Sequence, residues 1–152
     1  MTSLRFPMLR QMRGIPAATA ILLASYSPMY CQAAQPGNEI IGKWKFTKVL
    51  DLAEMASIDE HGARQLLGHV MTIRKDGARF DGEVCQPSDF ETKRVEPNLY
   101  LQQEAGVGNS KLRLPSPVTV IDISCTQVYV KKPNRAVIFW NGFFFEAVRV
   151  SR

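Results

Sequence analysis

The stretch AVIFWNGFFFEAVRV, residues 136–150, decides the fold of this chain. Asn141-Gly142 is typical of a type I′ turn, because both central positions of that turn need positive φ angles. The β-branched and aromatic residues on either side of it favour strands. We therefore predict an antiparallel hairpin. Its expected cross-strand pairs are Trp140–Phe143, Phe139–Phe144 and Ile138–Phe145.

Both faces of this hairpin are apolar, although a sheet with one wet face alternates more cleanly. The first face carries Ala136, Ile138, Trp140, Phe143, Phe145 and Ala147. The second carries Val137, Phe139, Phe144 and Val148, with Glu146 as its only charge. We expect a barrel core to cover the first face and a helix over Ala63–Leu67 to cover the second. The alternative is an exposed apolar patch that binds a partner or ligand.

Outward from the hairpin, most of the chain is predicted to form short strands separated by turn residues. These segments are Ile40–Lys48, Met71–Arg74, Ala78–Val84, Leu99–Gln103, Val118–Ile123 and Thr126–Lys131. One helix is expected after the first strand, because Ser57 and Glu60 form a capping-box pattern and Gly68 supplies a stop. The predicted fold class is mainly β: a single antiparallel β-barrel of about eight strands with one short helix. Closure hides the sheet edges.

The first 34 residues have the order of regions typical of a secretory signal peptide. Arginines near the start precede an apolar run, Ile15–Ala24, and small residues follow at Cys31-Gln32-Ala33-Ala34. We expect cleavage after Ala33 or Ala34. The expected layout is a signal at 1–34, a flexible lead-in at 35–39 and the barrel at 40–152. A stable membrane anchor is not expected, because the apolar run is about half of the roughly 20 residues that span a bilayer. Lipidation at Cys31 is the alternative.

Removing the signal changes the charge and the cysteine count. The full chain has 19 Lys+Arg against 14 Asp+Glu, a net charge of +5, and three cysteines. Loss of three arginines leaves 16 basic residues, a net charge of +2. Cys85 and Cys125 then remain, and an even pair in an exported protein indicates one disulfide. The alternative is two buried free thiols.

A nearly neutral mature domain with scattered basic residues argues against nucleic-acid binding. The sequence contains no phosphate loop and no dinucleotide fingerprint, so no cofactor is expected. Its two histidines, His61 and His69, match no zinc spacing and have no nucleophile motif beside them. Asp122 interrupts an apolar strand and either faces outward near a barrel rim, the interpretation we favour, or is buried with partners. We expect the protein not to be an enzyme.

Two short motifs resemble known families. Gly42-Lys43-Trp44 on the first strand, with Arg149 on the last, resembles the lipocalin and wider calycin pattern, in which the tryptophan packs against a basic residue. Gly-x-Trp together with Gly82-Glu83-Val84-Cys85 resembles META-type bacterial envelope domains, although Gln86 replaces the asparagine that usually follows this cysteine. The first resemblance implies ligand or protein binding, and the second implies an accessory role in the envelope.

We therefore expect a periplasmic or secreted bacterial protein of lipocalin-like type that holds a small apolar ligand. The alternative is a protein-interaction module that binds an envelope protein, such as an enzyme inhibitor or immunity protein. An envelope enzyme of unknown reaction is the third possibility. The predicted binding residues are Trp44, Phe139, Trp140, Phe143, Phe144, Phe145 and Arg149.

The signal peptide and the disulfide can be tested together by mass. The full chain, expressed in a bacterial host and recovered from the periplasm, should begin at Ala34 or Gln35. Its intact mass should be lower than that of the reduced polypeptide by two hydrogen atoms. Mass spectrometry before and after reduction measures both properties, and an uncleaved N-terminus would contradict the export prediction.

Overall fold

A computed structural model describes residues 37–86 and 90–151, which lie within the compact unit Ala33–Arg152. The predicted signal and its cleavage sites lie outside the described residues. A short 3-10 helix, η1 (Asn38–Ile40), precedes the first strand. The strands are β1 (Gly42–Leu52), β2 (Val70–Arg74), β3 (Gly77–Phe80), β4 (Glu83–Cys85), β5 (Glu91–Val95), β6 (Val118–Asp122), β7 (Gln127–Lys132), β8 (Arg135–Trp140) and β9 (Phe143–Ser151).

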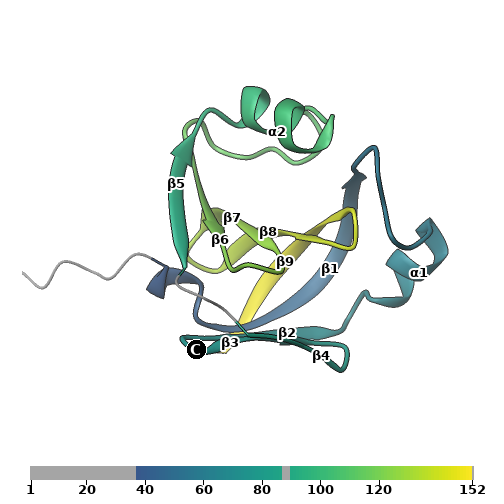
Figure 1. The fold of residues 1–152 in the computed structure, drawn as a ribbon, viewed down its shortest axis with the longest axis vertical. Coiled ribbons are helices and arrows are strands. Elements are labelled where there is room, and N and C mark those ends of the chain that lie inside the picture. The colour runs from purple at the N-terminus through teal and green to yellow at the C-terminus, as the bar shows by residue number, and fades with distance from the viewer. Residues whose placement is uncertain (1–36, 87–89, 152) are drawn as a thin grey trace, which may run out of the picture. The chain divides into compact units, whose positions relative to one another are not determined.

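The strands form one antiparallel sheet in the order β4-β3-β2-β1-β9-β8-β7-β6-β5. The sheet curls so that β2, β3 and β4 lie across from β6 to β9 (Figure 1). The predicted closed barrel of about eight strands is therefore wrong: the sheet is an open, half-barrel arrangement of nine strands. Part of the error lies at residues 78–84, where a turn at Asp81-Gly82 divides the predicted single strand into β3 and β4.

The edges of this open sheet are protected without closure. At one end, β4 is only three residues long. At the other end, the four residues Glu91-Thr92-Lys93-Arg94 of β5 are exposed and three of them are charged. Short and charged edge strands both discourage pairing with another chain. A disulfide between Cys85 and Cys125, with their Cα atoms 5.9 Å apart, joins β4 to the β6–β7 turn, which confirms the predicted bridge.

In the described residues, two α-helices flank the sheet. The helix predicted after the first strand is confirmed as α1 (Glu60–Gln65), although Asp59 is the N-cap in place of Ser57 and accepts a 2.7 Å hydrogen bond from Gly62 N. The strand predicted at Leu99–Gln103 is wrong, because this segment belongs to α2 (Pro97–Ala105). Pro97 occupies the first turn, where its missing N–H is harmless, and Gly106 ends the helix in the left-handed conformation.

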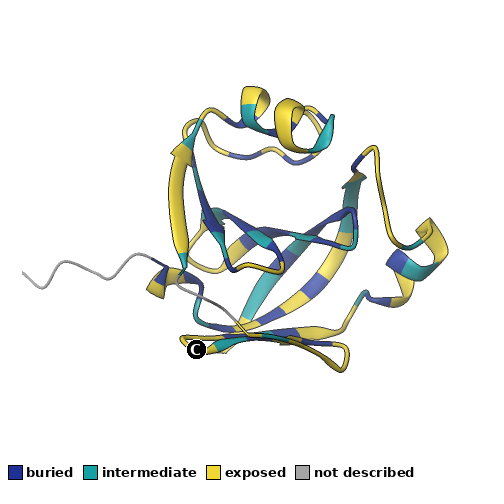
Figure 2. Ribbon diagram, in the orientation of Figure 1, coloured by how far each residue is buried: buried dark blue, intermediate teal, exposed yellow. Residues whose placement is uncertain are grey.

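The two faces of the β8–β9 hairpin belong to two separate cores, which Figure 2 shows as buried bands along these strands. The predicted register is confirmed at all three cross-strand pairs. The first face, with Ala63 of α1 and Leu66 at the C-cap of that helix, joins the inner core inside the curl. The second face joins an outer core that α2 and the following loop cover. The expectation that the Ala63–Leu67 helix covers the second face is therefore wrong.

The Asn141-Gly142 turn lies against the chain that follows β1. Asn141 and Gly142 have φ angles of 50° and 89°, as the predicted turn requires. Their carbonyl oxygens accept hydrogen bonds of 3.0 Å from Ser57 N and 2.8 Å from Ala53 N. A Cβ atom on Gly142 would lie 2.3 Å from Ala56 Cα. Only glycine fits this position.

Replacing Gly142 with alanine should therefore destabilise the fold for two reasons. The new side chain strains a positive φ and meets the backbone of Ala56, so we expect a loss of roughly 3 kcal/mol or more. Gly68→Ala is the matched control, because Gly68 has the same φ of 89° but open space around its Cβ position. It should lose only about 1 kcal/mol. Urea denaturation, monitored by circular dichroism, measures the free energy of unfolding of both variants. Equal losses in the two variants would contradict the close contact at Gly142.

Candidate functional site

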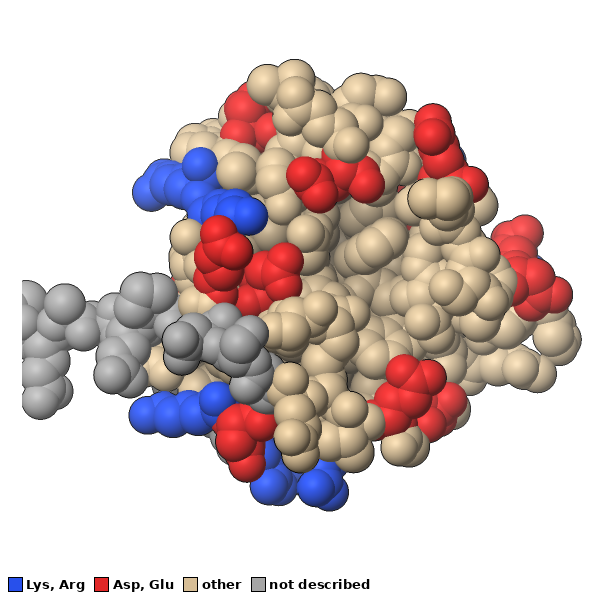
Figure 3. Space-filling view, viewed as in Figure 1, with Lys and Arg blue, Asp and Glu red and all other residues tan. Residues whose placement is uncertain are grey.

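A pocket of about 210 Å³ opens between the end of α2 and the outer face of the sheet. We call it the acidic-aromatic pocket. Its wall combines four strands, β6 to β9, with the β6–β7 turn and the last helical turn. The lining residues are Glu104, Ala105, Asp122, Ser124, Cys125, Thr126, Gln127, Tyr129, Phe139 and Phe144. Figure 3 shows this face of the molecule with a hollow near its centre and acidic side chains beside it.

Aromatic rings from three neighbouring strands form the floor of the pocket. Tyr129 of β7, Phe139 of β8 and Phe144 of β9 line it together. The Phe144 ring lies 4.7 Å from Phe139 and 5.9 Å from Tyr129, centroid to centroid. Phe144 and Tyr129 are buried, whereas Phe139 is half-buried. The floor is therefore a rigid apolar surface with one ring open to a ligand.

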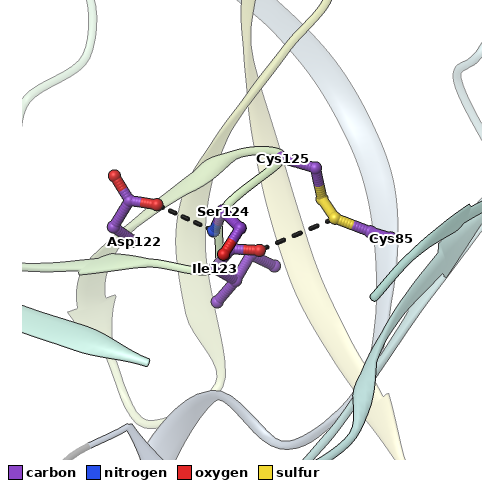
Figure 4. Close-up of a disulfide and its surroundings, with 5 residues drawn as sticks. All are labelled: Cys85, Asp122, Ile123, Ser124 and Cys125. Atoms are coloured by element: carbon purple, nitrogen blue, oxygen red, sulfur yellow. Dashed lines mark hydrogen bonds between the residues drawn. A yellow bond between two sulfur atoms is a disulfide. The ribbon is translucent and has the colours of Figure 1, made fainter. Parts of the chain in front are cut away.

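The β6–β7 turn forms one rim, and its shape is fixed by local contacts (Figure 4). Asp122 Oδ1 accepts a 2.8 Å hydrogen bond from Ser124 N. Ile123 N donates to Thr126 O at 3.0 Å. The disulfide at Cys125 holds the turn against β4, where Cys85 Sγ lies 3.6 Å from Ile123 O. Asp122 is half-buried at the end of β6 and lines the acidic-aromatic pocket.

The opposite rim is the last turn of α2, which contributes Glu104 and Ala105. Ala105 O accepts a hydrogen bond from Glu54 N at 3.3 Å, so this turn is tied to the chain after β1. A Cβ atom on Gly106 would lie 2.6 Å from the Glu54 carboxyl group. Gly106 thus packs closely against the same residue, Glu54, that donates to Ala105 O.

The electrostatics of the pocket favour positive charge. Burial raises the pKa of Tyr129, and the nearby Tyr100, Glu104 and Asp122 raise that pKa further. Burial also raises the pKa of Tyr100, with Glu104 as the next cause. Both phenols are therefore neutral donors at physiological pH, and two carboxylates supply the charge of the lining. Glu104 is exposed and Asp122 is half-buried, and both carboxylates attract a cation at the mouth of the pocket.

Gln127 is held in place by these two phenols. Tyr129 Oη donates to Gln127 Oε1 at 2.8 Å, and Gln127 Nε2 donates to Tyr100 Oη at 3.2 Å. Thr126 differs, because it is 5% exposed and its Oγ1 has no hydrogen-bond partner among the described residues. An unsatisfied buried hydroxyl costs about 1–3 kcal/mol. A polar group beside Thr126 would remove that cost.

The structure separates the predicted binding residues into two groups. Phe139 and Phe144 line the pocket. Trp44, Trp140, Phe143 and Phe145 belong to the inner core, each at most 6% exposed. There the rings pack together, with centroid distances of 4.4 Å for Phe46–Phe80 and 5.4 Å for Phe80–Trp140. Aromatic side chains thus fill the interior of the curl. Because α2 covers Phe144, the second hairpin face is not an exposed patch.

Arg149 binds the protein itself. Its guanidinium carbon lies 4.3 Å from the centroid of the Trp44 ring, as the sequence motif predicts. Its nitrogens donate to Ile41 O at 2.5 Å, to Pro133 O at 3.0 Å and to Glu39 O. Trp44 Nε1 donates to Ile40 O at 2.7 Å. We call this arrangement the Trp-Arg clasp.

The histidines take no part in the pocket. His61 lies in α1 with its Nε2 3.1 Å from Gln65 Nε2. His69 lies before β2 with its Nδ1 3.0 Å from Asp81 Oδ1. The side chains of His69 and Asp81 are both about half exposed. Within residues 37–86 and 90–151, no cluster of three or more histidine, cysteine, aspartate or glutamate residues is placed to hold a metal ion. No helix in the same ranges is long and apolar enough to cross a bilayer.

Sequence reasoning missed most of the acidic-aromatic pocket. It singled out Asp122 because of its place among apolar residues, but Glu104, Thr126, Gln127 and Tyr129 gave no comparable signal. Comparisons with protein-family models, with curated proteins and with solved structures found no match for this chain. The lipocalin-like and META-type resemblances therefore remain predictions from short motifs.

The Trp-Arg clasp predicts a specific sensitivity to charge-conserving substitution. Arg149→Lys keeps the positive charge, but one ammonium group cannot reach the three carbonyl oxygens in this geometry. We expect a loss of roughly 2–3 kcal/mol in the free energy of unfolding. Arg74→Lys, at an exposed position of β2, is the control and should change little. Chemical denaturation measures both variants. If Arg149→Lys left the free energy of unfolding unchanged, the clasp would contribute little to stability.

Proposed function

We propose that the protein is an exported, non-catalytic binding module whose ligand occupies the acidic-aromatic pocket. The ligand that suits this lining is small, with an apolar or aromatic part and a cationic group. The observation that carries the proposal is the combination of Phe139 on an aromatic floor with the carboxylates of Glu104 and Asp122 beside it. The Cys85–Cys125 disulfide supports the proposed export, because such bonds persist in oxidising compartments.

The proposed ligand is matched by three kinds of contact. Aromatic faces attract cations and pack against apolar groups. Carboxylates form charge-assisted hydrogen bonds with ammonium or guanidinium groups. The free Thr126 hydroxyl offers a further polar contact. This proposal keeps the predicted ligand-binding function but places the ligand beneath α2, because aromatic side chains fill the interior of the curl.

The pocket can be probed with two molecules of similar shape. At neutral pH, 2-phenylethylamine is a cation, whereas 2-phenylethanol is not. Isothermal titration calorimetry on the mature protein should show binding of the amine at least about tenfold tighter than of the alcohol, equivalent to one charge-assisted hydrogen bond. Equal affinities, or no binding of either probe, would contradict the proposed ligand class.

Substitutions assign the binding to the pocket. Glu104→Gln with Asp122→Asn should abolish the preference for the amine, while the amide that replaces the Asp122 carboxylate keeps an oxygen that can accept from Ser124 N. Phe139→Ala should weaken the binding of both probes, because it removes the aromatic ring that is open to the ligand. Glu60→Gln with Glu83→Gln removes two exposed carboxylates outside the pocket and is the matched control. A control that lost the amine preference equally would indicate a general charge effect.

A further inference from the structure

A second hollow, of about 570 Å³, lies over the β1 side of the outer sheet face. We call it the basic groove. Strands β1, β7, β8 and β9 contribute to it, together with the loop after α2. Its lining residues are Lys48, Leu50, Ser110, Lys111, Arg113, Lys131, Arg135 and Glu146. It shares no lining residue with the acidic-aromatic pocket.

Positive charge in the basic groove exceeds negative charge. Five of its residues are cationic, and Glu146 is its one acid. Glu146 Oε1 lies 3.5 Å from Arg135 Nη1 and 3.9 Å from Lys131 Nζ, so one carboxylate is shared by two ion pairs. Just outside, Asp51 pairs with Lys111 at 2.8 Å. Counting Asp51 as well, five cations face two acids, which leaves a charge of +3.

Two of the cations have no ion-pair partner in the described part of the chain. Lys48 lies opposite Glu146 in the β1–β9 register, but Glu146 pairs with Lys131 and Arg135 and not with Lys48. Arg113 is exposed and makes no ion pair with the described residues. Burial lowers the pKa of Lys131, Glu146 raises that pKa, and Arg135 and Arg113 lower it. A bound anion would relieve this crowding of positive charge.

The loop that carries Lys111 and Arg113 is held in one conformation. Asn109 accepts from Arg113 N at 2.8 Å through its carbonyl oxygen, and from Leu114 N at 2.7 Å through Oδ1. Lys131 Nζ donates to Leu112 O at 2.8 Å. Arg113 itself has a φ of 52°, a left-handed conformation that is costly for a residue with a side chain. Such strained positions cluster at functional sites.

The ligand of the basic groove need not be a bare ion. An adjoining hollow of about 390 Å³ shares Lys48, Leu50 and Lys111 with the groove. Leu52, Leu67 and Phe143 add apolar lining to this hollow. There is consequently room for an organic group attached to an anion that lies between the lysines and arginines.

We propose that the basic groove binds a phosphate monoester. Two arginines at its wall can each form paired hydrogen bonds with phosphate oxygens, and the lysines add point charges. A dianion matches the surplus charge better than a monovalent carboxylate does. This second site is independent of the ligand proposed for the acidic-aromatic pocket.

Glycerol 3-phosphate and glycerol test the proposal as a soluble pair, by calorimetry on the mature protein. Vesicles of phosphatidylcholine with and without phosphatidic acid test the same headgroup chemistry on a lipid, by co-sedimentation. We expect the phosphate-bearing partner of at least one pair to bind, and to bind at least tenfold more weakly in 0.5 M salt than in 0.05 M salt because exposed charges are screened. The proposal is overturned if neither phosphate ligand binds. It is also overturned if glycerol, or the vesicles without phosphatidic acid, bind as well as the phosphate-bearing partner does.

Arg113→Gln with Arg135→Gln assigns the binding to the groove. Both side chains are exposed, so the variant should fold, and its phosphate affinity should fall at least about tenfold. Lys75→Gln with Arg94→Gln removes the same charge from exposed positions outside the groove and should retain the affinity. Circular dichroism confirms folding of each variant. An equal loss in both variants would show general attraction to a basic protein and would overturn the site.

Discussion

The Trp-Arg clasp is the interaction on which the rest of the structure depends. It joins β1 to β9, and these two strands lie in the middle of the sheet, with β2 to β4 on one side and β8 to β5 on the other. Arg149 also binds the carbonyl oxygens of Glu39 and Ile41 before β1, and that of Pro133 between β7 and β8. One side chain thereby fixes three segments that are distant in sequence. Both halves of the curl are positioned relative to this centre.

The hairpin at 136–150 was predictable because its signals are local. Asn141-Gly142 specifies the turn, and alternation then assigns the buried side chains of the hairpin to the inner or the outer core. The disulfide was predictable for a different reason, since only two cysteines, Cys85 and Cys125, lie outside the predicted signal. The helix α2 was mistaken for a strand because Leu99, Tyr100 and Leu101 look strand-like in isolation. Pro97 and Gly106, which bracket the helix, were the better signals.

Closure and the candidate site depend on long-range geometry, and the sequence carries less information about both. Whether a curled sheet closes depends on how its last strands meet, and here a covalent bond links the edge strand β4 to the β6–β7 turn without strand pairing. The acidic-aromatic pocket likewise exists only after α2 has packed over β7 to β9. Asp122 had a local signal, whereas Thr126 became notable only once its buried hydroxyl was found without a partner among the described residues.

The central β1–β9 pair also has a consequence for the order of events during synthesis. The clasp joins Arg149 to Ile41, which is 108 positions earlier in the chain. A ribosome must therefore translate nearly all of this sequence before β1 can meet its main partner. Proteins dominated by such distant pairings fold slowly. The β1–β9 pair and the clasp across it can therefore form only near the end of synthesis, whereas pairs such as β1–β2 and β6–β7 join strands that are closer in sequence.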